Sequence, residues 1–415
     1  MSVTKPLCVG GTATPSRQSL LALGWLNFFL AGMQTAFGPI AAAYLAAQQW
    51  TAKDIGFVLS IGGVASLASQ VPGGELLDAI RAKRQLVAAA VLIVALSTLM
   101  LRLWPSFPVV ATAHVLQGVT GGVLGPGVVA ITLGLVGHAA LAERLGRNQR
   151  FAATGGVAVT LTMALVAYSE SSWAMFVPVV LAAPVLVALH LIRAEEVDFR
   201  RASGADGPHA KQAQRAARHV ALLENRPLQI FATCVVLFQL ANASMLPLAS
   251  GMLAHEGKRE AAPLVAALII VPQLIVALLA PWVGARAETR GRKPLLLVGF
   301  AALPVRAMLF ALTSNPLALV VIQVLDGITG AVLGVMTALV IADVTKGTGR
   351  FNLAQGVFGT MMGVGASLSP TLSGLIVHHF GHAIGFASLA VEGLVALVVL
   401  AFFLPETKGE HSRRG

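Results

Sequence analysis

The chain has 415 residues, of which 56% are hydrophobic and only 11% are charged, and its mean hydropathy is +0.79. So few polar side chains cannot cover a water-soluble globule of this length, so the composition excludes that class and indicates an integral membrane protein. The formal net charge of +11 fits loops that contact anionic lipid headgroups, and we infer no nucleic-acid partner from it.

The first 18 residues are polar, and a long apolar run follows them. That run is long enough to remain in the bilayer as a helix, so we expect no cleavable signal peptide. Apolar runs of roughly 20 residues, enough to cross a ~30 Å hydrocarbon core, recur along the chain and predict an all-α fold with twelve transmembrane helices. The expected spans are 19–47, 54–78, 85–103, 107–137, 150–168, 172–193, 226–253, 261–285, 293–313, 316–342, 351–378 and 383–404.

The longest polar stretch between the expected spans covers residues 194–225 and separates six spans from six. We interpret it as a solvated linker between two six-helix bundles, with some helix between 209 and 223, rather than as a regulatory element. Two halves of like orientation are related by an axis along the membrane normal, which predicts pseudo-symmetry. The expected domains are a cytoplasmic tail 1–18, a bundle 19–193, the cytoplasmic linker 194–225, a bundle 226–405 and a cytoplasmic tail 406–415.

Most of the 29 Lys and Arg residues fall in the tails, the linker and the loops on one side of the expected bundles. Cytoplasmic loops retain basic residues, so we expect both termini in the cytoplasm and a multi-pass location in a bacterial inner (plasma) membrane. Cys8 then lies in a cytoplasmic tail and Cys234 in a helix, and no disulfide is expected.

The loop after the second expected span has a counterpart after the eighth. The corresponding residues are Gly74, Asp78, Arg81 and Arg84 in the first loop and Gly284, Glu288, Gly291 and Arg292 in the second. A tight turn needs small residues, and Asp78 can lie beside the partly positive amino-terminal end of a helix, for which the helix starting near Phe351 is the candidate. Such a contact between halves exists in only one of two conformations, so we interpret these residues as conformational latches. A turn that merely orients its two helices is the alternative.

A segment that runs from His114 to Gly125 in the fourth span recurs from Gln323 to Gly334 in the tenth. His114 can change charge near physiological pH, so it can bind a proton or substrate if it faces a cavity. The alternative is a neutral His bonded to a neighbouring helix. The position that matches Gln117 is Asp326, about ten residues or ~15 Å into its span and therefore close to the midplane.

On these motifs the chain resembles the major facilitator superfamily over about residues 19–405. The loop at Gly74 is similar to that family's G-x-L-x-D-R-x-G-R-R signature, and a second copy stands at the symmetry-related place. The resemblance implies a two-bundle transporter whose first, fourth, seventh and tenth helices line a central cavity. The polar candidates on those helices are Asn27, Gln34, His114, Gln117, Gln239, Asn242, Gln323 and Asp326.

An ionised carboxylate at the midplane is costly unless it is paired, so Asp326 is the leading candidate for proton coupling, together with His114, Arg306 and Glu392. In one interpretation Asp326 carries the proton while Arg306 is bound to Glu392. In the other, Asp326 and Arg306 form a buried structural pair.

None of the cavity candidates carries a fixed positive charge, which favours neutral, weakly basic or amphipathic cargo over polyanions. We expect secondary transport by alternating access, with proton-coupled export of small amphipathic or weakly basic compounds. Proton-coupled uptake of a small neutral or weakly acidic metabolite is one alternative, and a non-transporting membrane receptor or metal-handling protein is another. The expected partners are a small-molecule substrate, protons and the lipid bilayer, and the chain is expected to be a monomer.

The sequence has no phosphate-binding loop of the Gly-Lys-Ser/Thr type and no recognisable catalytic arrangement, so we expect neither an enzyme nor a cofactor. His378, His379 and His382 are the one metal-like group. No acid or Cys stands near them in the sequence, so we expect an exposed loop and no metal site.

Overall fold

The computed structural model describes residues 15–167, 176–205, 226–255 and 261–407, and within these ranges the chain is helical, without strands. The longer elements are α1 (Arg17–Ala47), α2 (Ala52–Ala79), α3 (Lys83–Leu103), α4 (Phe107–Val136), α5 (Leu141–Ala167), α6 (Val177–Leu191), α10 (Arg226–Asn242), α11 (Met245–His255), α12 (Ala261–Arg290), α13 (Lys293–Leu312), α14 (Pro316–Ile322), α15 (Val324–Thr345) and α16 (Phe351–Phe403). A short helix, α7 (Phe199–Ala202), lies in the described part of the linker.

The expected twelve-helix fold is found once three irregular elements in the described ranges are allowed for. α10 and α11 form one span, broken at Ala243 and Ser244, and α14 and α15 form another, broken at Gln323. α16 contains two spans, because Gly381 turns the chain at φ 84 and ψ 169 without a longer loop. Only a residue without a Cβ atom adopts this backbone conformation readily.

One boundary differs clearly from expectation, because α5 starts at Leu141 rather than at 150. Its first turns are polar, and Glu143 and Arg147 form an ion pair between successive turns on an exposed face. A search for apolar runs does not detect a helix that extends beyond the apolar region. The start expected for the next span, residue 172, lies outside the described residues.

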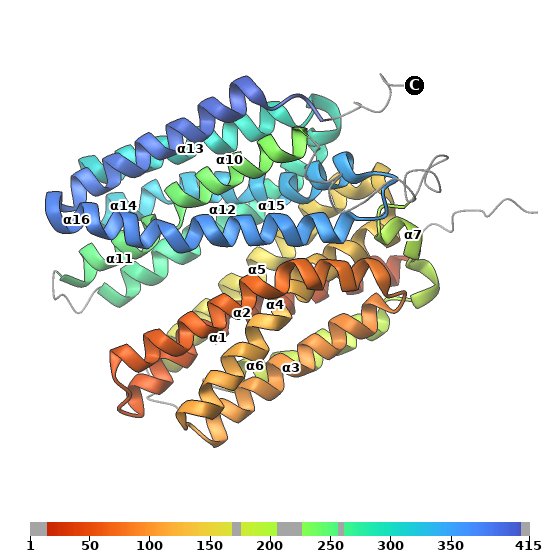
Figure 1. Ribbon diagram of the computed structural model, residues 1–415, viewed down its shortest axis with the longest axis horizontal. Coiled ribbons are helices and arrows are strands. Elements are labelled where there is room, and N and C mark those ends of the chain that lie inside the picture. The colour runs from red at the N-terminus through yellow and green to blue at the C-terminus, as the bar shows by residue number, and fades with distance from the viewer. Residues whose placement is uncertain (1–14, 168–175, 206–225, 256–260, 408–415) are drawn as a thin grey trace, which may run out of the picture.

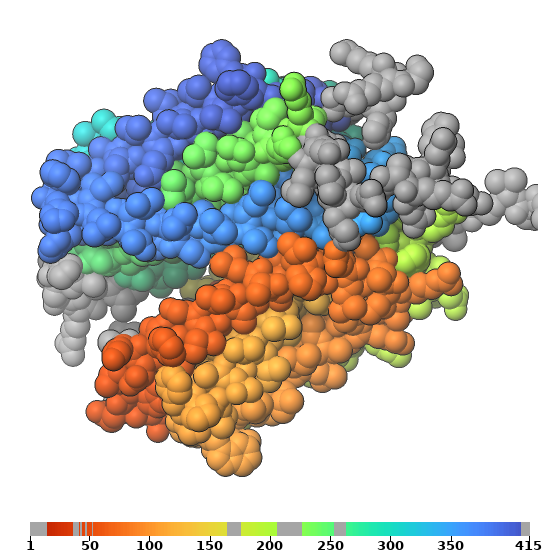
Figure 2. Space-filling model, viewed as in Figure 1, coloured from red at the N-terminus to blue at the C-terminus, as the bar shows by residue number. Residues whose placement is uncertain are grey.

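The elements α1–α6 form one half of the molecule and α10–α16 the other (Figure 1). We call the end where α7 and the last described residues lie the linker end, and the opposite end the far end. At the linker end α2 packs on the first part of α16, which we call the first seam, and α5 packs on α12, which we call the second seam. Toward the far end the halves diverge and leave a wedge-shaped opening (Figure 2).

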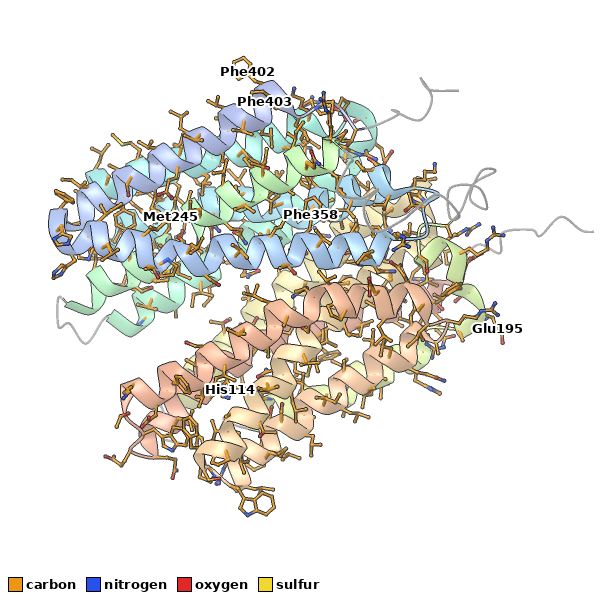
Figure 3. The ribbon with its side chains drawn as sticks, viewed as in Figure 1. His114, Glu195, Met245, Phe358, Phe402 and Phe403 are labelled. Carbon is orange, nitrogen blue, oxygen red and sulfur yellow. The ribbon has the colours of Figure 1, made fainter. Side chains whose placement is uncertain are left out.

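The surface of the bundle is apolar as well as its core. Phe231, Phe300 and Phe358 are fully buried in the second half. Phe402 and Phe403, by contrast, are 80% and 64% exposed and point away from the bundle (Figure 3). Large exposed apolar side chains on long helices are what a lipid environment favours, because lipid tails, unlike water, impose no penalty on them.

The last described residues of the linker are packed between the halves, which corrects the expectation of a solvated segment for residues 202–205, whereas Glu195, Asp198 and Arg200 are exposed. Ala202 and Ser203 are buried. Asp198 N donates to Gly134 O in the first half (3.2 Å), while Ser203 O accepts from Phe351 N in the second (3.3 Å). Composition does not reveal this packing, because backbone groups make the bonds. The helix expected at 209–223 lies outside the described residues.

The amino-terminal end of α1 is tied to the same linker segment. Ser16 N and Ser16 Oγ each donate to the Glu196 carboxylate at 3.0 Å, and Arg193 N donates to Ser19 Oγ at 3.1 Å. Desolvation acts to raise the pKa of Glu196, but the hydrogen bonds from Ser16 and the charge of Arg193 outweigh it, so the pKa lies below its ordinary value. The first helix is thus anchored at the linker end.

Candidate functional site

Asp78, near the end of α2, lies against the amino-terminal end of α16 in the other half. Its carboxylate accepts hydrogen bonds from Leu353 N (2.9 Å), Asn352 N (3.3 Å) and Asn352 Nδ2 (2.7 Å). The unpaired N–H groups and the dipole of a helix start favour a carboxylate at this place. The Asn352 amide also donates to Ala202 O of the linker (2.9 Å), so α2, α16 and the linker meet at one side chain.

Glycine lets the helices cross closely at both seams. A Cβ atom at Gly74 would clash with the backbone oxygen of Asn352, and a Cβ atom at Gly284, the matching position of the second loop, would clash with the backbone oxygen of Ala142. The two seams therefore have equivalent backbone packing. They differ in their side chains, because Ala142 stands where the first seam has Asn352 and its methyl group supplies no donor.

The two Arg residues expected in the first latch contact their own half and the linker instead of α16. The Arg81 guanidinium lies 5.9 Å from the centre of the Phe199 ring in α7. Arg84 donates to Leu189 O (3.0 Å) and His190 O (3.1 Å) at the end of α6. The physical reason is that the start of α16 is partly positive and attracts Asp78, not a cation.

The second loop is bonded largely within its own half. Glu288 lies 3.3 Å from Arg292, and Arg292 Nε donates to Asp343 Oδ2 at 2.9 Å. Arg292 N also donates to Glu406 Oε1 at 2.8 Å, and Gly291 makes the turn at φ 86. Sequence analysis identified this loop but missed Asp343 and Glu406, which lie far from it in the chain.

The second seam contains a polar contact that sequence analysis missed. Arg150 Nε of α5 donates to the backbone oxygen of Ala277 in α12 at 3.0 Å. Next to it, a Cβ atom at Gly334 of α15 would lie 2.6 Å from Gln149 Nε2, so Gln149 packs directly on that glycine. The available signal was Pro281, four residues after Ala277, because proline leaves that carbonyl without its helical donor.

His114 is 4% exposed and lies inside the first half (Figure 3). Its Nδ1 is 3.0 Å from Val110 O in the preceding turn of α4. A Cβ atom at Gly62 of α2 would lie 3.2 Å from His114 Cβ, so the side chain is at the α2–α4 contact. The bond to Val110 O is within α4, whereas the stated alternative placed the partner on a neighbouring helix; α2 supplies a packing contact.

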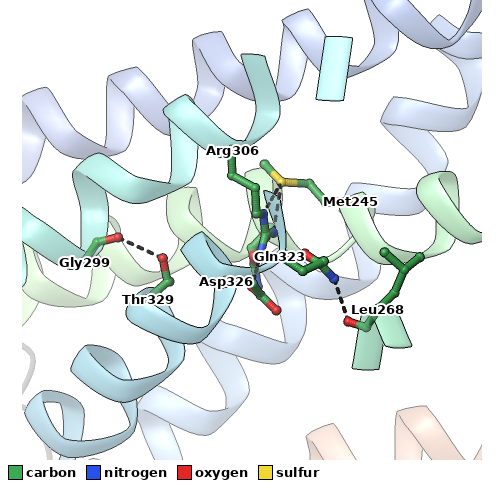
Figure 4. Close-up of polar contacts among 8 residues, drawn as sticks. Met245, Leu268, Gly299, Arg306, Gln323, Asp326 and Thr329 are labelled. Carbon is green, nitrogen blue, oxygen red and sulfur yellow. Dashed lines mark hydrogen bonds and ion pairs between the residues drawn. The ribbon is translucent and has the colours of Figure 1, made fainter. Parts of the chain in front are cut away.

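The second half holds a buried ion pair between α13 and α15 (Figure 4). Arg306 donates through Nη1 to Asp326, through Nη2 to Asn242 Oδ1 (2.5 Å) and through Nε to Met245 Sδ (3.1 Å). The Arg306 side chain is 3% exposed, whereas Asp326 is 30% exposed. The carboxylate is therefore partly exposed, whereas the guanidinium behind it is enclosed by protein.

The pair lies where two spans are broken. Asn242 is the last residue of α10, Met245 is the first of α11, and Asp326 is in the first turn of α15. Broken helices near the midplane leave backbone groups and side chains that hold ions or ligands in many transporters. The partly positive start of α15 also favours the negative charge of the Asp326 carboxylate.

Gln323 is structural in this conformation. Its Nε2 donates to Leu268 O of α12 at 2.8 Å, and the side chain is 1% exposed (Figure 4). Leu268 stands four residues before Pro272, so this carbonyl too lacks its helical donor. The amide completes the hydrogen bonding of α12 and is not available to a substrate here.

The remaining amide candidates fall into two groups. Asn27 Nδ2 donates to Leu23 O of its own helix at 2.7 Å, which is a local bond. Gln34 is exposed, and Gln117 and Gln239 are half-buried. Within the described ranges, Asn242 and Asp326 are the sequence candidates that join one polar network through Arg306.

Glu392 does not hold Arg306 in this structure, so the interpretation that paired them is not the one observed. Its Oε2 is buried without a hydrogen-bond partner among the described residues. The next residue, Gly393, packs on Leu303 and Pro304 of α13, one turn from Arg306. Arg306 instead extends toward α15 and the α10–α11 break, where Asp326 and Asn242 supply its acceptors.

In the part of the chain that the structure describes, no three His, Cys, Asp or Glu side chains gather as metal ligands would. His378 and His379 lie in the helical part of α16 before Gly381, where a loop was expected, and their ring centres are 5.0 Å apart.

The fold and the site together define a membrane transporter: two helical bundles, closed together at one end and open at the other, with an ion pair at broken helices between the ends.

Comparisons with known proteins agree with this class. The sequence profile of the Major Facilitator Superfamily matches residues 23–272 and 231–415, and the chain belongs to that family. An uncharacterised MFS-type transporter of Mycobacterium tuberculosis is 36% identical over 93% of both chains.

Shorter similarities reach two resistance proteins. The tetracenomycin C resistance and export protein of Streptomyces glaucescens is 32% identical over 29% of this chain and 22% of its own, and the class B tetracycline resistance protein of Escherichia coli is 31% identical over 34% of each. Among solved structures, the proton:xylose symporter XylE superposes with a TM-score of 0.74 at 15% identity, covering 94% of this chain and 96% of that one. That likeness concerns the fold alone.

Proposed function

We propose that this family member works by alternating access and exports small amphipathic or weakly basic compounds in exchange for protons. The observation that carries the proposal is Asp326, a partly exposed carboxylate beside a buried guanidinium at two helix breaks. A cationic or hydrogen-bonding group on a substrate can approach this carboxylate. An anionic group would meet its charge first, so polyanionic cargo is disfavoured.

The ion pair restricts how a proton can bind. Protonation of Asp326 leaves the buried Arg306 charge without a counter-ion, which in a low-dielectric interior costs several kcal/mol. A proton therefore cannot be taken up unless Arg306 finds another acceptor or the helix breaks rearrange. In this proposal a local protonation is linked to a movement of helices.

Glu392 is the candidate second acceptor. Its buried Oε2 has no hydrogen-bond partner within the described ranges, and its neighbour Gly393 packs one turn from Arg306 on α13. We propose that Arg306 is held by Asp326 in the deprotonated state and moves toward Glu392 when Asp326 is protonated. The two interpretations of the sequence then describe two states of one site.

We place the linker end in the cytoplasm, because most Lys and Arg residues lie in the segments at that end. With that orientation the structure has its latched side toward the cytoplasm and its opening toward the outside. Asp78 and Asn352 stabilise this state, because their bonds join the two halves. The similarity to two resistance proteins, one named for export, supports the outward direction.

The test is a transport assay in cells that lack their own efflux pumps. Cells producing the wild type, D326N or the control D54N are exposed to a panel of lipophilic amines and antibiotics, and intracellular accumulation is measured at equal membrane levels of protein. Asp54 is a suitable control because it is a partly exposed acid in the first turn of α2, at the far end of the molecule, and its side chain bonds only to Thr51 among the described residues. We expect wild type and D54N to lower the accumulation of at least one compound, and D326N to abolish the effect.

The direction of the change decides between the alternatives. Raised accumulation of a neutral or acidic compound in wild-type cells supports proton-coupled uptake in place of export. Equal protection by wild type and D326N contradicts the coupling role of Asp326.

A further inference from the structure

We infer that Arg150 is a positioning residue that holds the second seam closed through a backbone carbonyl that proline has freed. The inference goes beyond the proposed site, because Arg150 lies on α5 and contacts neither Asp326 nor Arg306 in the described structure. It rests on the proposed alternating access in one respect: the effect of Arg150 can be measured only if the second seam opens. The contact itself is the 3.0 Å bond from Arg150 Nε to Ala277 O.

The chemistry of α12 creates the acceptor. In an α-helix the oxygen of Ala277 would pair with the N–H of residue 281, but that residue is Pro281 and has no N–H. A carbonyl left unpaired in a membrane interior is destabilising, because no water is there to donate a hydrogen bond to it. A donor outside the helix must therefore form a hydrogen bond to Ala277 O while that oxygen is shielded from water.

The donor comes from the other half of the molecule. Arg150 is in α5 and Ala277 in α12, and the helices cross closely beside them, because a Cβ atom at Gly146 would clash with Ala280 O. The bond forms only while α5 and α12 touch. When the halves separate at the linker end, water replaces Arg150 and the bond is lost.

The same helix contains an internal comparison. Pro272 frees Leu268 O, and Gln323 Nε2 serves that oxygen at 2.8 Å. Gln323 belongs to the same half as α12, so this bond does not depend on how the halves are arranged. Of the two α12 carbonyls that lack a helical donor because of proline, Leu268 O accepts a hydrogen bond from its own half and Ala277 O accepts one from the other half.

This asymmetry has a counterpart between the seams. In the first seam Asp78 and Asn352 join the halves through side chains. In the second seam the residue equivalent to Asn352 is Ala142, and Arg150 supplies a cross-seam bond a few turns further along α5. Each seam is therefore closed by a polar contact on top of its glycine packing.

The experiment is a double-mutant cycle on the full chain in lipid nanodiscs. Nitroxide labels at Ala140 and Thr289 report the linker end, and labels at Lys53 and Ser314 report the far end, with Cys8 replaced by Ser. Distance distributions are recorded for wild type, R150A, P281A and R150A/P281A. The matched control is R147A, because Arg147 is an exposed Arg one turn away that pairs with Glu143 of its own helix.

P281A restores the N–H that Ala277 needs, so it should make Arg150 dispensable. We expect R150A to lower the ratio of closed to open linker-end populations about tenfold, which corresponds to the loss of one charge-assisted hydrogen bond. In the P281A background the same change should shift the ratio by less than about twofold. R147A should match the wild type.

Two results overturn the inference: an R150A distribution equal to that of the wild type, or an R150A shift that is equally large with Pro281 present and in the P281A background. If the wild type shows a single distance at both ends under every condition, the proposed alternation fails instead. Thermal unfolding of the same four proteins then decides about Arg150, since the inference requires R150A to lower the melting temperature with Pro281 present and to leave it unchanged in the P281A background.

Discussion

Asp326 and Arg306 differ tenfold in exposure, 30% against 3%, although they form one ion pair. Removing the carboxylate alone leaves a buried cation, whereas removing both charges leaves a neutral interior. We expect D326N to lower the free energy of unfolding by about 3 kcal/mol and R306M/D326N to recover at least half of that loss. Thermal unfolding in detergent checks this. A double variant as unstable as the sum of the two single variants contradicts it.

At this scale the sequence predicts charged partners better than backbone partners. Asp78 was expected at a helix start, and the Asp326–Arg306 contact was one of two stated alternatives. Both could be predicted because a carboxylate is attracted to a positive charge or to the positive end of a helix dipole. Arg150 was missed because its acceptor is a main-chain oxygen, which every residue has. Only Pro281 marks that oxygen as unusual.

At the scale of helices, the seams depend on glycine at crossing points. We expect G74V to prevent closure at the linker end, because its side chain would overlap the backbone of Asn352. G63V, on the same helix, is the control, since a Cβ atom at Gly63 meets none of the described residues within 4 Å. The label pair at Ala140 and Thr289 measures the outcome. An unchanged closed population in G74V would count against close crossing as the basis of the latch.

The corner inside α16 gives a second prediction. Gly381 has φ 84 and ψ 169, so G381A forces an L residue into a disfavoured conformation and should destabilise the protein by about 1–2 kcal/mol. G374A is the matched substitution, because Gly374 is in the regular helix with open space around it in the described structure. It should be neutral or stabilising by up to about 1 kcal/mol. Equal melting temperatures for the two variants would contradict the strain.

Spans were predicted well from apolar runs, and their irregularities were not. The breaks at Ser244 and Gln323 do not lower the hydropathy enough to be located, and the polar first turns of α5 lie outside the apolar run that marks its span. The packing of Ser203 and Gly204 depends on backbone bonds to the second half, which composition does not encode. What a sequence of this kind predicts is therefore where helices cross the bilayer, more than how they bend or what fills the gaps.

For the whole molecule, the proposed orientation makes a direct prediction about labelling. Ala140 at the linker end and Ser314 at the far end are both exposed in the structure. With the linker end in the cytoplasm, A140C should react with a membrane-impermeant maleimide only after the cells are permeabilised, and S314C should react in intact cells. The reverse pattern would invert the topology and, with it, the sidedness of the opening.

The bond from Asn352 to Ala202 means that the connection between the halves is itself part of the closed gate. This has a consequence for chain connectivity. If the protein is divided into two separately made polypeptides, the first should end after Ala205, so that Ser203 and Gly204 remain to dock on the second half. A first polypeptide that stops at Ile192 contains the same six membrane helices but lacks these linker residues. The two polypeptides should then associate less tightly at the linker end.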